Sequence, residues 1–332
     1  MAITRTAFLL LVLPILLLVS VPVSAASGEG AQAKRQQQVR KALERNKAHK
    51  AITLCDTYLG KEPVAAFYPL RADGYNRIGE HARAERDARA GLAAGAPADA
   101  CMLQLAIAQA GLGQGDSAIK HLNALMERSN DAELGFRLAL AYQGAGRCAE
   151  ALAVIDRTVQ DTSGSKAVRV HRLRGECAAV QGDSITALRE LERAVALEPR
   201  DPVNHNSLGF YGYALREQHA QAVACYDRAI KLNPNYSYAF NNRGWSEFRL
   251  GKVDKALSDI GKARKRKPNN PYIYRNFGLI FLAQGDTAKA CTQFRQALDL
   301  GFTTLHGPEV ERTMAVACGG RATPVQAPNT PL

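Results

Sequence analysis

The chain has 332 residues, of which 46% are hydrophobic and 22% are charged, and its formal net charge at pH 7 is +12. This composition excludes a disordered chain, because enough apolar side chains are present to form a core. The positive charge favours acidic partners, although it also serves solubility. Alanine-rich segments with few β-branched runs predict an all-α protein.

The first residues are typical of an export signal. A single positive charge, Arg5, precedes an uncharged apolar run of about 17 residues. Residues 23–25, Val-Ser-Ala, then fit the small-x-small pattern of a signal-peptidase site. We therefore expect residues 1–26 to be a signal peptide and the protein to be periplasmic or secreted. The alternative is a membrane anchor that is not cleaved, because the apolar run approaches the length that spans a bilayer.

A pattern of small residues begins near Lys34 and recurs with a period of about 34 residues, which is typical of a helix-turn-helix repeat. Its clearest copy spans residues 237–270. The three regular copies place their small residues at Gly175, Gly182, Ala187 and Ala194, at Gly244, Gly251, Ala256 and Ala263, and at Gly278, Gly285, Ala290 and Ala297. Two antiparallel helices approach closely only where side chains are small, and Gly251 fits the turn between them. The pattern therefore predicts pairs of packed helices.

The recurring alanine of the second helix aligns eight such units. It falls at Ala51, Ala84, Ala118, Ala151, Ala187, Ala222, Ala256 and Ala290. The first four units are degenerate, and in the first of them Val39 and Asn46 stand at both glycine positions. The sixth unit has one residue more between Gly209 and Ala222 than its neighbours have, which predicts a longer turn or a bulge in its first helix.

The spacing of Gly244, Ala256, Ala263 and Pro268 resembles the consensus of the tetratricopeptide repeat family. The resemblance implies a right-handed α-solenoid of about eight helix-turn-helix repeats, which we place at residues 34–304. Each helix pair buries too little surface to be stable alone, so every repeat depends on its neighbours.

The repeat pattern stops after Leu300. A short helix between Pro308 and Ala317 is expected to cover the apolar end of the last repeat, and we place this C-terminal cap at residues 305–320. Residues 321–332 contain three prolines and no apolar periodicity, so we expect this tail to be disordered.

The family resemblance also implies a concave groove lined by the first helix of each pair. Asparagines on these helices grip the backbone of an extended peptide in related proteins, and an amide can both donate and accept hydrogen bonds. The predicted peptide-binding surface comprises Asn206, Tyr238, Asn241, Asn242, Trp245, Arg249, Tyr272, Arg275 and Asn276. Asparagine is also common in such helices without any ligand. Trp245, the only tryptophan, would anchor a partner here or, one helical position away, be buried between repeats.

We expect a non-enzymatic scaffold that binds a protein or an extended peptide, with Arg249 and Arg275 favouring an acidic one. The chain carries no His-Glu-x-x-His, P-loop or nucleophile-elbow motif, so no active site and no cofactor are expected. One alternative is an envelope or secretion-complex assembly factor that docks through its convex or terminal surfaces. Another is an accessory subunit acting on acidic polysaccharide.

A basic run at residues 262–267 lies at the end of a predicted second helix. It lacks interleaved aromatic residues, so nucleic acid is not expected as a partner. Membrane contact is expected only through this basic edge or an uncleaved N-terminal segment.

The seven cysteines show neither redox nor zinc spacing. In an oxidising compartment two disulfides are conceivable, one joining Cys148 to Cys177 and one joining Cys291 to Cys318. Buried free thiols are the alternative for each pair.

Overall fold

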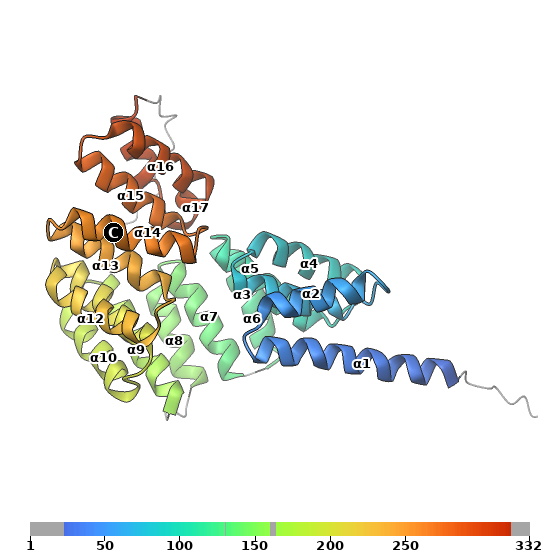
Figure 1. The fold of residues 1–332 in the computed structure, drawn as a ribbon. Coiled ribbons are helices and arrows are strands. Elements are labelled where there is room, and N and C mark those ends of the chain that lie inside the picture. The colour runs from blue at the N-terminus through green and yellow to red at the C-terminus, as the bar shows by residue number, and fades with distance from the viewer. Residues whose placement is uncertain (1–22, 130, 160–163, 320–332) are drawn as a thin grey trace, which may run out of the picture.

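The computed structural model describes residues 23–129, 131–159 and 164–319, and this part of the chain is a stack of eight antiparallel helix pairs followed by two short helices (Figure 1). The first four pairs are α1 (Val23–Glu44) with α2 (Ala48–Leu59), α3 (Phe67–Ile78) with α4 (His81–Ala93), α5 (Ala98–Gly111) with α6 (Gly115–Met126), and α7 (Ala132–Gly144) with α8 (Cys148–Thr158). The next is α9 (Gly164–Val180) with α10 (Ser184–Leu197). The last three pair α11 (Pro202–Ser207) and its continuation with α12 (His219–Leu232), α13 (Ser237–Arg249) with α14 (Val253–Arg266), and α15 (Pro271–Ala283) with α16 (Thr287–Asp299). The predicted all-α solenoid is confirmed.

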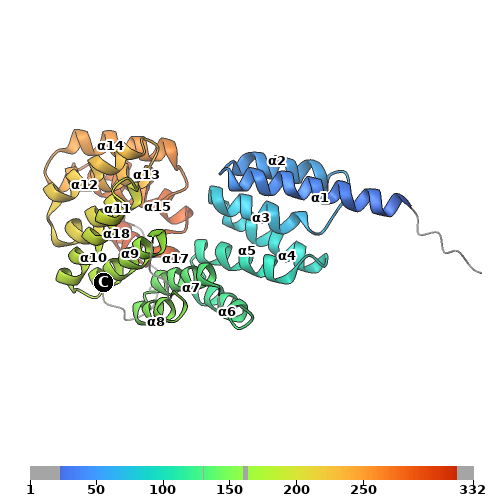
Figure 2. The ribbon, with the colours of Figure 1, turned by 90° about the horizontal axis from the view of Figure 1, so that it is seen from below.

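The solenoid is curved, with the two helices of each pair on opposite sides. In Figure 1 the pairs from α1 to α6 lie to the right and those from α9 to α16 to the left, joined by α7 and α8. Figure 2 shows α8, α10, α12 and α14 on the outside of the C-terminal curve and α7, α9, α11 and α13 nearer its middle. The first helices therefore form the inner side, as the family resemblance implies.

The recurring glycines lie either in the turn between two helices or where the two helices touch. Gly251 closes the turn between α13 and α14 with a φ of 77°, which glycine adopts at little cost. Gly244 lies where these helices touch, because a Cβ added there would come 2.7 Å from Ile260 Cγ1 and 3.0 Å from the backbone oxygen of Ala256. Ala256, Ala263 and Ile260 are fully buried in the same interface.

The irregular sixth unit has the expected bulge. After α11 the helix widens into a π-helical segment, η1 (Leu208–Tyr213), and a short 3₁₀ turn, η2 (Ala214–Arg216). The left-handed turn position is then taken by Glu217, with a φ of 58°. In the first unit Asn46 adopts the same conformation, which asparagine tolerates better than most residues.

The C-terminal cap consists of α17 (Phe302–His306) and α18 (Glu309–Ala317). Phe302 and Val310 are buried against Phe294 of α16. A disulfide joins Cys291 of α16 to Cys318, with 5.9 Å between the Cα atoms.

The other conceivable disulfide, between Cys148 and Cys177, is not formed. Both side chains are free thiols buried in the apolar cluster between α8 and α9. Burial and the neighbouring Cys148 raise the pKa of the Cys177 thiol, so little of the reactive thiolate is present.

Most of the predicted signal peptide and the whole predicted tail lie outside the described residues. None of the helices in the described part of the chain combines the length and the apolar character needed to span a bilayer.

Candidate functional site

The predicted asparagines form one hydrogen-bonded chain across three repeats. Asn242 Nδ2 donates to Asn206 Oδ1 at 3.1 Å, and Asn276 Nδ2 donates to Asn241 Oδ1 at 3.1 Å. A longer contact of 3.5 Å from Asn241 Nδ2 to Asn242 Oδ1 joins the two halves. Arg275 Nη1 ends the chain by donating to Asn276 Oδ1 at 2.9 Å.

This chain changes what the individual asparagines can do. Asn241 and Asn276 are only 4% and 3% exposed, because their amides are buried between α13 and α15. Their hydrogen bonds hold neighbouring repeats together, and a ligand cannot reach them without separating these helices. Asn206 and Asn242 remain half-buried at the surface. Asn242 and Asn276, which stand one repeat apart at the same position of the first helix, therefore differ in accessibility and bond to different neighbours.

Two tyrosines stand exposed at equivalent positions of α13 and α15. Tyr238 is 42% exposed and Tyr272 is 39% exposed. Lys267 Nζ donates to the Tyr238 hydroxyl at 2.5 Å and lies 4.5 Å from the ring centroid. The Tyr272 ring packs against Phe302 of the cap, with 5.2 Å between ring centroids. Both side chains are thus held in place by contacts within the chain while offering an open face.

Glu176 joins three successive repeats on the inner side. Burial raises the pKa of Tyr211 in η1, and the negative charge of Glu176 and the phenol of Tyr272 raise it further. Glu176 lies on α9 and accepts hydrogen bonds from Gln143 Nε2 at 2.8 Å and from Ser207 Oγ at 2.6 Å. We call the exposed surface that carries Asn206, Asn242, Tyr238 and Tyr272 the inner face.

Trp245 is neither fully exposed nor buried between repeats. Its half-buried indole lies under the guanidinium of Arg275, with 4.7 Å between Arg275 Cζ and the ring centroid, and packs against Phe248. Glu309 of α18 in turn binds Arg275, with 2.5 Å between Nη2 and Oε1.

The two predicted arginines do not offer free positive charge. Arg249 pairs with Glu217 at 2.5 Å between Nη2 and Oε2, just as Arg275 pairs with Glu309. Each carboxylate offsets most of the attraction that the arginine would exert on an acidic ligand.

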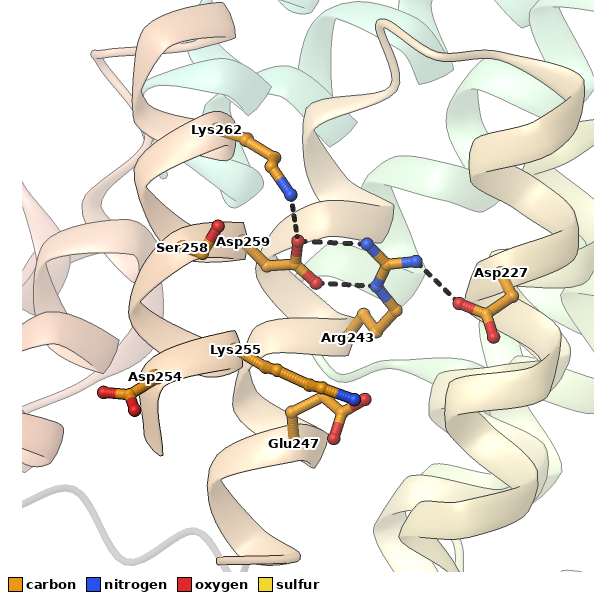
Figure 3. Close-up of a pocket in the computed structure, with 8 residues that line it drawn as sticks. All are labelled: Asp227, Arg243, Glu247, Asp254, Lys255, Ser258, Asp259 and Lys262. Carbon is orange, nitrogen blue, oxygen red and sulfur yellow. Dashed lines mark hydrogen bonds and ion pairs between the residues drawn. The ribbon is translucent and has the colours of Figure 1, made fainter. Parts of the chain in front are cut away.

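The outer side carries an ionic cleft that the sequence patterns above did not single out. A cavity of about 490 Å³ opens between α12, α13 and α14 (Figure 3). Arg243 spans it, donating to Asp259 at 2.6 and 3.0 Å and to Asp227 at 2.6 Å. Lys262 Nζ also donates to Asp259, at 3.0 Å.

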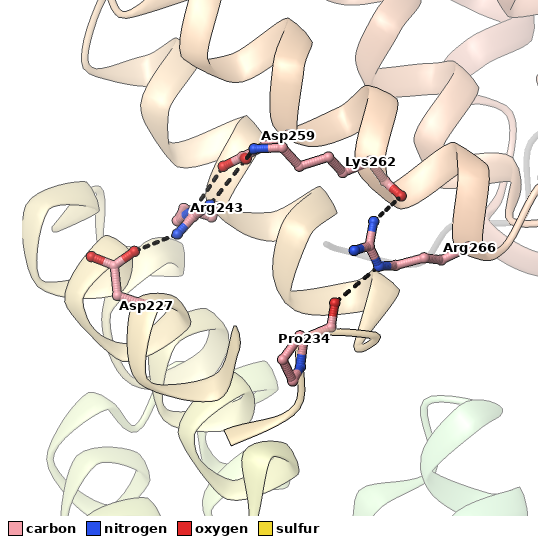
Figure 4. A network of polar contacts seen from close by, with 6 residues as sticks. All are labelled: Asp227, Pro234, Arg243, Asp259, Lys262 and Arg266. Atoms are coloured by element: carbon pink, nitrogen blue, oxygen red, sulfur yellow. Dashed lines mark hydrogen bonds and ion pairs between the residues drawn. The ribbon is translucent and has the colours of Figure 1, made fainter. Parts of the chain in front are cut away.

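Helix α14, which carries Asp259 and Lys262, contacts the preceding repeat through a second residue, Arg266. Figure 4 shows Arg266 donating to the backbone oxygens of Lys262 and Pro234, each at 3.0 Å. The contacts from Arg243 to Asp227 and from Arg266 to Pro234, both exposed, join the sixth and seventh repeats.

This ionic arrangement is repeated in the second unit. Arg71 donates to Asp87 at 2.7 and 2.8 Å and to Asp56 of the preceding repeat at 2.7 Å. The hydrogen bonds that Arg71 donates to Asp87 raise the pKa of Arg71. Both ion pairs share a sequence pattern that could have been found. The arginine stands one residue before the small residue of the first helix, and the aspartate stands three residues after the recurring alanine of the second helix.

No group of histidine, cysteine and acidic side chains in the described ranges is arranged to hold a metal ion. The inner face combines hydrogen bonds and ion pairs with two exposed aromatic rings, and the ionic cleft on the outer side is held by ion pairs. Such a surface can bind another molecule. Ser246 Oγ lies 3.2 Å from His219 Nδ1, and His219 Nε2 lies 3.1 Å from Glu217 Oε2, but Ser246 and His219 are only 0% and 6% exposed, so a substrate does not reach the hydroxyl.

Comparison with known proteins agrees with the geometry. A sequence profile described as "Tetratricopeptide repeat" matches residues 136–205, 213–271 and 242–301. The chain is 25% identical over 190 residues to the Caenorhabditis elegans protein "Tetratricopeptide repeat-containing protein trd-1", an alignment that covers 57% of this chain and 24% of that protein. It is 24% identical over 195 residues to "Hsp70-Hsp90 organizing protein 3" of Arabidopsis thaliana, covering 56% of this chain and 34% of the relative.

The chain thus spans about a quarter to a third of the length of these two relatives. Among solved structures, a chain in "Crystal structure of APC/C hetero-tetramer Cut9-Hcn1" superposes with a TM-score of 0.53 at 14% identity, covering 84% of this chain and 55% of that chain. At this identity the likeness concerns the fold alone.

Proposed function

Because the chain belongs to the tetratricopeptide repeat family, we propose that it is a non-enzymatic scaffold whose inner face binds a segment of a partner protein. Repeats of this kind present an extended concave surface, and curated relatives carry names of protein-assembly factors, such as the organizing protein from Arabidopsis thaliana.

The observation that carries this proposal is the repetition of an exposed tyrosine on adjacent repeats. Tyr238 and Tyr272 stand one repeat apart on the inner face, with the half-buried amides of Asn206 and Asn242 beside them. Tyrosine is enriched among residues that dominate binding energy, because its ring buries much apolar area and its hydroxyl keeps a polar contact. The two rings provide apolar contact for a bound segment.

Fewer asparagines are accessible to a ligand than the sequence predicts. Asn206 and Asn242 are the two members of the asparagine chain that a ligand can reach. Asn206 accepts a hydrogen bond from Asn242, and its own Nδ2 has no acceptor among the described residues. This amide group is therefore free to donate to a carbonyl of a peptide backbone. Asn241 and Asn276 act as internal supports.

The charge of the partner follows from the ion pairs of Arg249 and Arg275. An acidic segment would have to displace Glu217 or Glu309 to reach these guanidinium groups, and the gain would largely cancel. We therefore assign most of the affinity to the tyrosines, and an acidic character of the partner is not required.

The experiment is a capture assay with the full chain as bait. Tyr238→Ala combined with Tyr272→Ala should abolish recovery of the partner, whereas Ile185→Ala should not. Ile185 is a suitable control because it is 81% exposed on α10, a second helix on the outer side. Undiminished recovery by the double tyrosine variant would refute the inner face as the binding surface and would favour docking through outer or terminal surfaces.

We further propose that the protein works in an oxidising, extracytoplasmic compartment. The disulfide between Cys291 and Cys318 supports this, because structural disulfides persist mainly in such compartments. Cell fractionation followed by mass determination of the mature chain tests the proposal. A chain that stays in the cytoplasm with both thiols reduced would contradict it.

A further inference from the structure

The outer side of the last repeat carries a second cleft, of about 360 Å³, with a chemistry unlike that of the ionic cleft. Its floor is formed by Phe277 and Phe281 of α15, whose rings stack with 6.0 Å between centroids and an angle of 10° between planes. Arg264 of α14 and Lys289 of α16 border the cleft, and Gln293 of α16 lines it.

The two clefts are the same position of the fold in successive repeats. One repeat after Arg243 the chain has Phe277, and one repeat after Asp259 it has Gln293. In the earlier cleft the arginine and its aspartates satisfy one another, as Figure 3 shows. In the later cleft Phe277 replaces the arginine and Gln293 replaces Asp259. No ion pair fills this space, and its floor is apolar.

A buried polar atom in the later cleft has no partner. The Oε1 atom of Gln293 is inaccessible to solvent and accepts no hydrogen bond from any described residue. A buried carbonyl without a donor costs free energy, so a bound group that brings an N–H to this atom would be favoured.

The border of the cleft is positive. Arg264 Cζ lies 5.1 Å from the centroid of the Phe277 ring, and Lys289 Nζ lies 5.7 Å from that of Phe281. Arg264 forms no ion pair with a described carboxylate, unlike Arg249 and Arg275 on the inner face, whereas Lys289 pairs with Asp286 at 2.6 Å.

We propose that this outer cleft is a second binding site, which takes an acidic segment of a partner protein through one inserted aromatic side chain. The stacked phenylalanines favour an apolar ring, and Arg264, which forms no ion pair with a described carboxylate, attracts a carboxylate next to that ring. Tryptophan suits the site because its large indole packs on the phenylalanines, and its N–H can donate to Gln293 Oε1 once this half-buried side chain turns toward the cleft. The site lies on the outer helices and is independent of the inner face.

The test measures binding of a fluorescein-labelled peptide, Glu-Glu-Trp-Glu-Glu, to the full chain by fluorescence anisotropy. The wild-type chain should bind it at least about tenfold more tightly than Glu-Glu-Ala-Glu-Glu and Lys-Lys-Trp-Lys-Lys, because both the ring and the carboxylates contribute. Equal binding of the alanine peptide would reduce the interaction to charge attraction and overturn the proposal.

Two variants locate the site. Ala288→Trp should weaken binding about tenfold by filling the cleft from the exposed side of α16, and Arg264→Glu should do so by reversing one border charge. Lys265→Glu makes the same change of charge at the next, exposed residue of α14 and should bind as wild type. If Ala288→Trp and Arg264→Glu bind the peptide like Lys265→Glu, the cleft is not the site.

The tyrosine variants separate this inference from the inner-face proposal. Tyr238→Ala with Tyr272→Ala should leave binding of the acidic tryptophan peptide unchanged. A loss in that variant, with Ala288→Trp unaffected, would place the peptide on the inner face and refute the outer site. Binding to vesicles of anionic phospholipid in place of the peptide, abolished by Arg264→Glu, would refute a protein partner in favour of a membrane surface.

Discussion

The guanidinium of Arg275 covers the indole of Trp245, with 4.7 Å between Arg275 Cζ and the ring centroid. The arginine is itself held by Glu309 of α18 and donates to Asn276 in the asparagine chain. The C-terminal cap is therefore connected through one side chain to the inner face of the two last repeats.

Glu309→Gln should release Arg275 and expose Trp245. The ion pair is partly exposed, so its loss should cost no more than about 1 kcal/mol of unfolding free energy. The effect on the indole should be clear, because Trp245 is the only tryptophan and its fluorescence is read without interference. Quenching by acrylamide should increase in this variant. Glu311→Gln is the control, since Glu311 contacts Thr303 instead of Arg275, and equal quenching in both variants would show that Glu309 does not hold the arginine in place.

Removal of the disulfide should loosen the cap. Cys291 and Cys318 are separated by 27 residues in the sequence. Closing a loop of this size stabilises a fold by about 3 kcal/mol, chiefly by restricting the unfolded chain. In Cys318→Ser, amide hydrogens of α17 and α18 should exchange at least about ten times faster. A tenfold increase corresponds to a loss of about 1.4 kcal/mol in the free energy of local opening. Cys225→Ser, at a half-buried free thiol, should leave their exchange unchanged.

Gly244→Ala should destabilise the protein. The added Cβ would meet Ile260 Cγ1 at 2.7 Å and the Ala256 backbone oxygen at 3.0 Å, and the backbone atom cannot move without bending α14. We expect a loss of about 2 kcal/mol in chemical denaturation.

Gly261→Ala is the matched comparison for this substitution. Gly261 lies within α14, and a Cβ there meets no atom within 4 Å. Alanine in a helix is favoured over glycine by roughly 0.5–1 kcal/mol, so this variant should be more stable than wild type. The same sign of change in both variants would contradict the close approach of α13 and α14.

The ionic cleft should behave as a coupled unit. Arg243→Met leaves the carboxylate of Asp259, which is 4% exposed, with only Lys262 as a partner, and should cost about 3 kcal/mol. Arg243→Met combined with Asp259→Leu should recover much of this loss, because no buried charge then remains unpaired. Additive losses in a double-mutant cycle measured by urea unfolding would show that the two residues do not interact.

Much of the fold follows from spacing, because the positions of small residues are set by contact between neighbouring helices. The extra residue between Gly209 and Ala222 predicts a bulge, and the structure has a π-helical segment there. Such local features depend on residues close in sequence, which a single chain displays directly.

The candidate site was less predictable, since it depends on side chains from different repeats. Asn242 and Asn276 are equivalent in sequence, yet only Asn242 remains accessible, because Asn276 lies between α13 and α15 and is covered by Arg275. The carboxylates that offset Arg249 and Arg275 come from an irregular turn and from the cap. Neither position follows from a repeat consensus.

The covalent link between α16 and the segment after α18 gives the solenoid a direction of unravelling. In a linear array the terminal units detach first, since each has one neighbour instead of two. Because the disulfide holds the cap on α16, the apolar end of the last repeat stays covered, and the described array should fray from α1 and α2 before the repeats with the two proposed binding surfaces come apart.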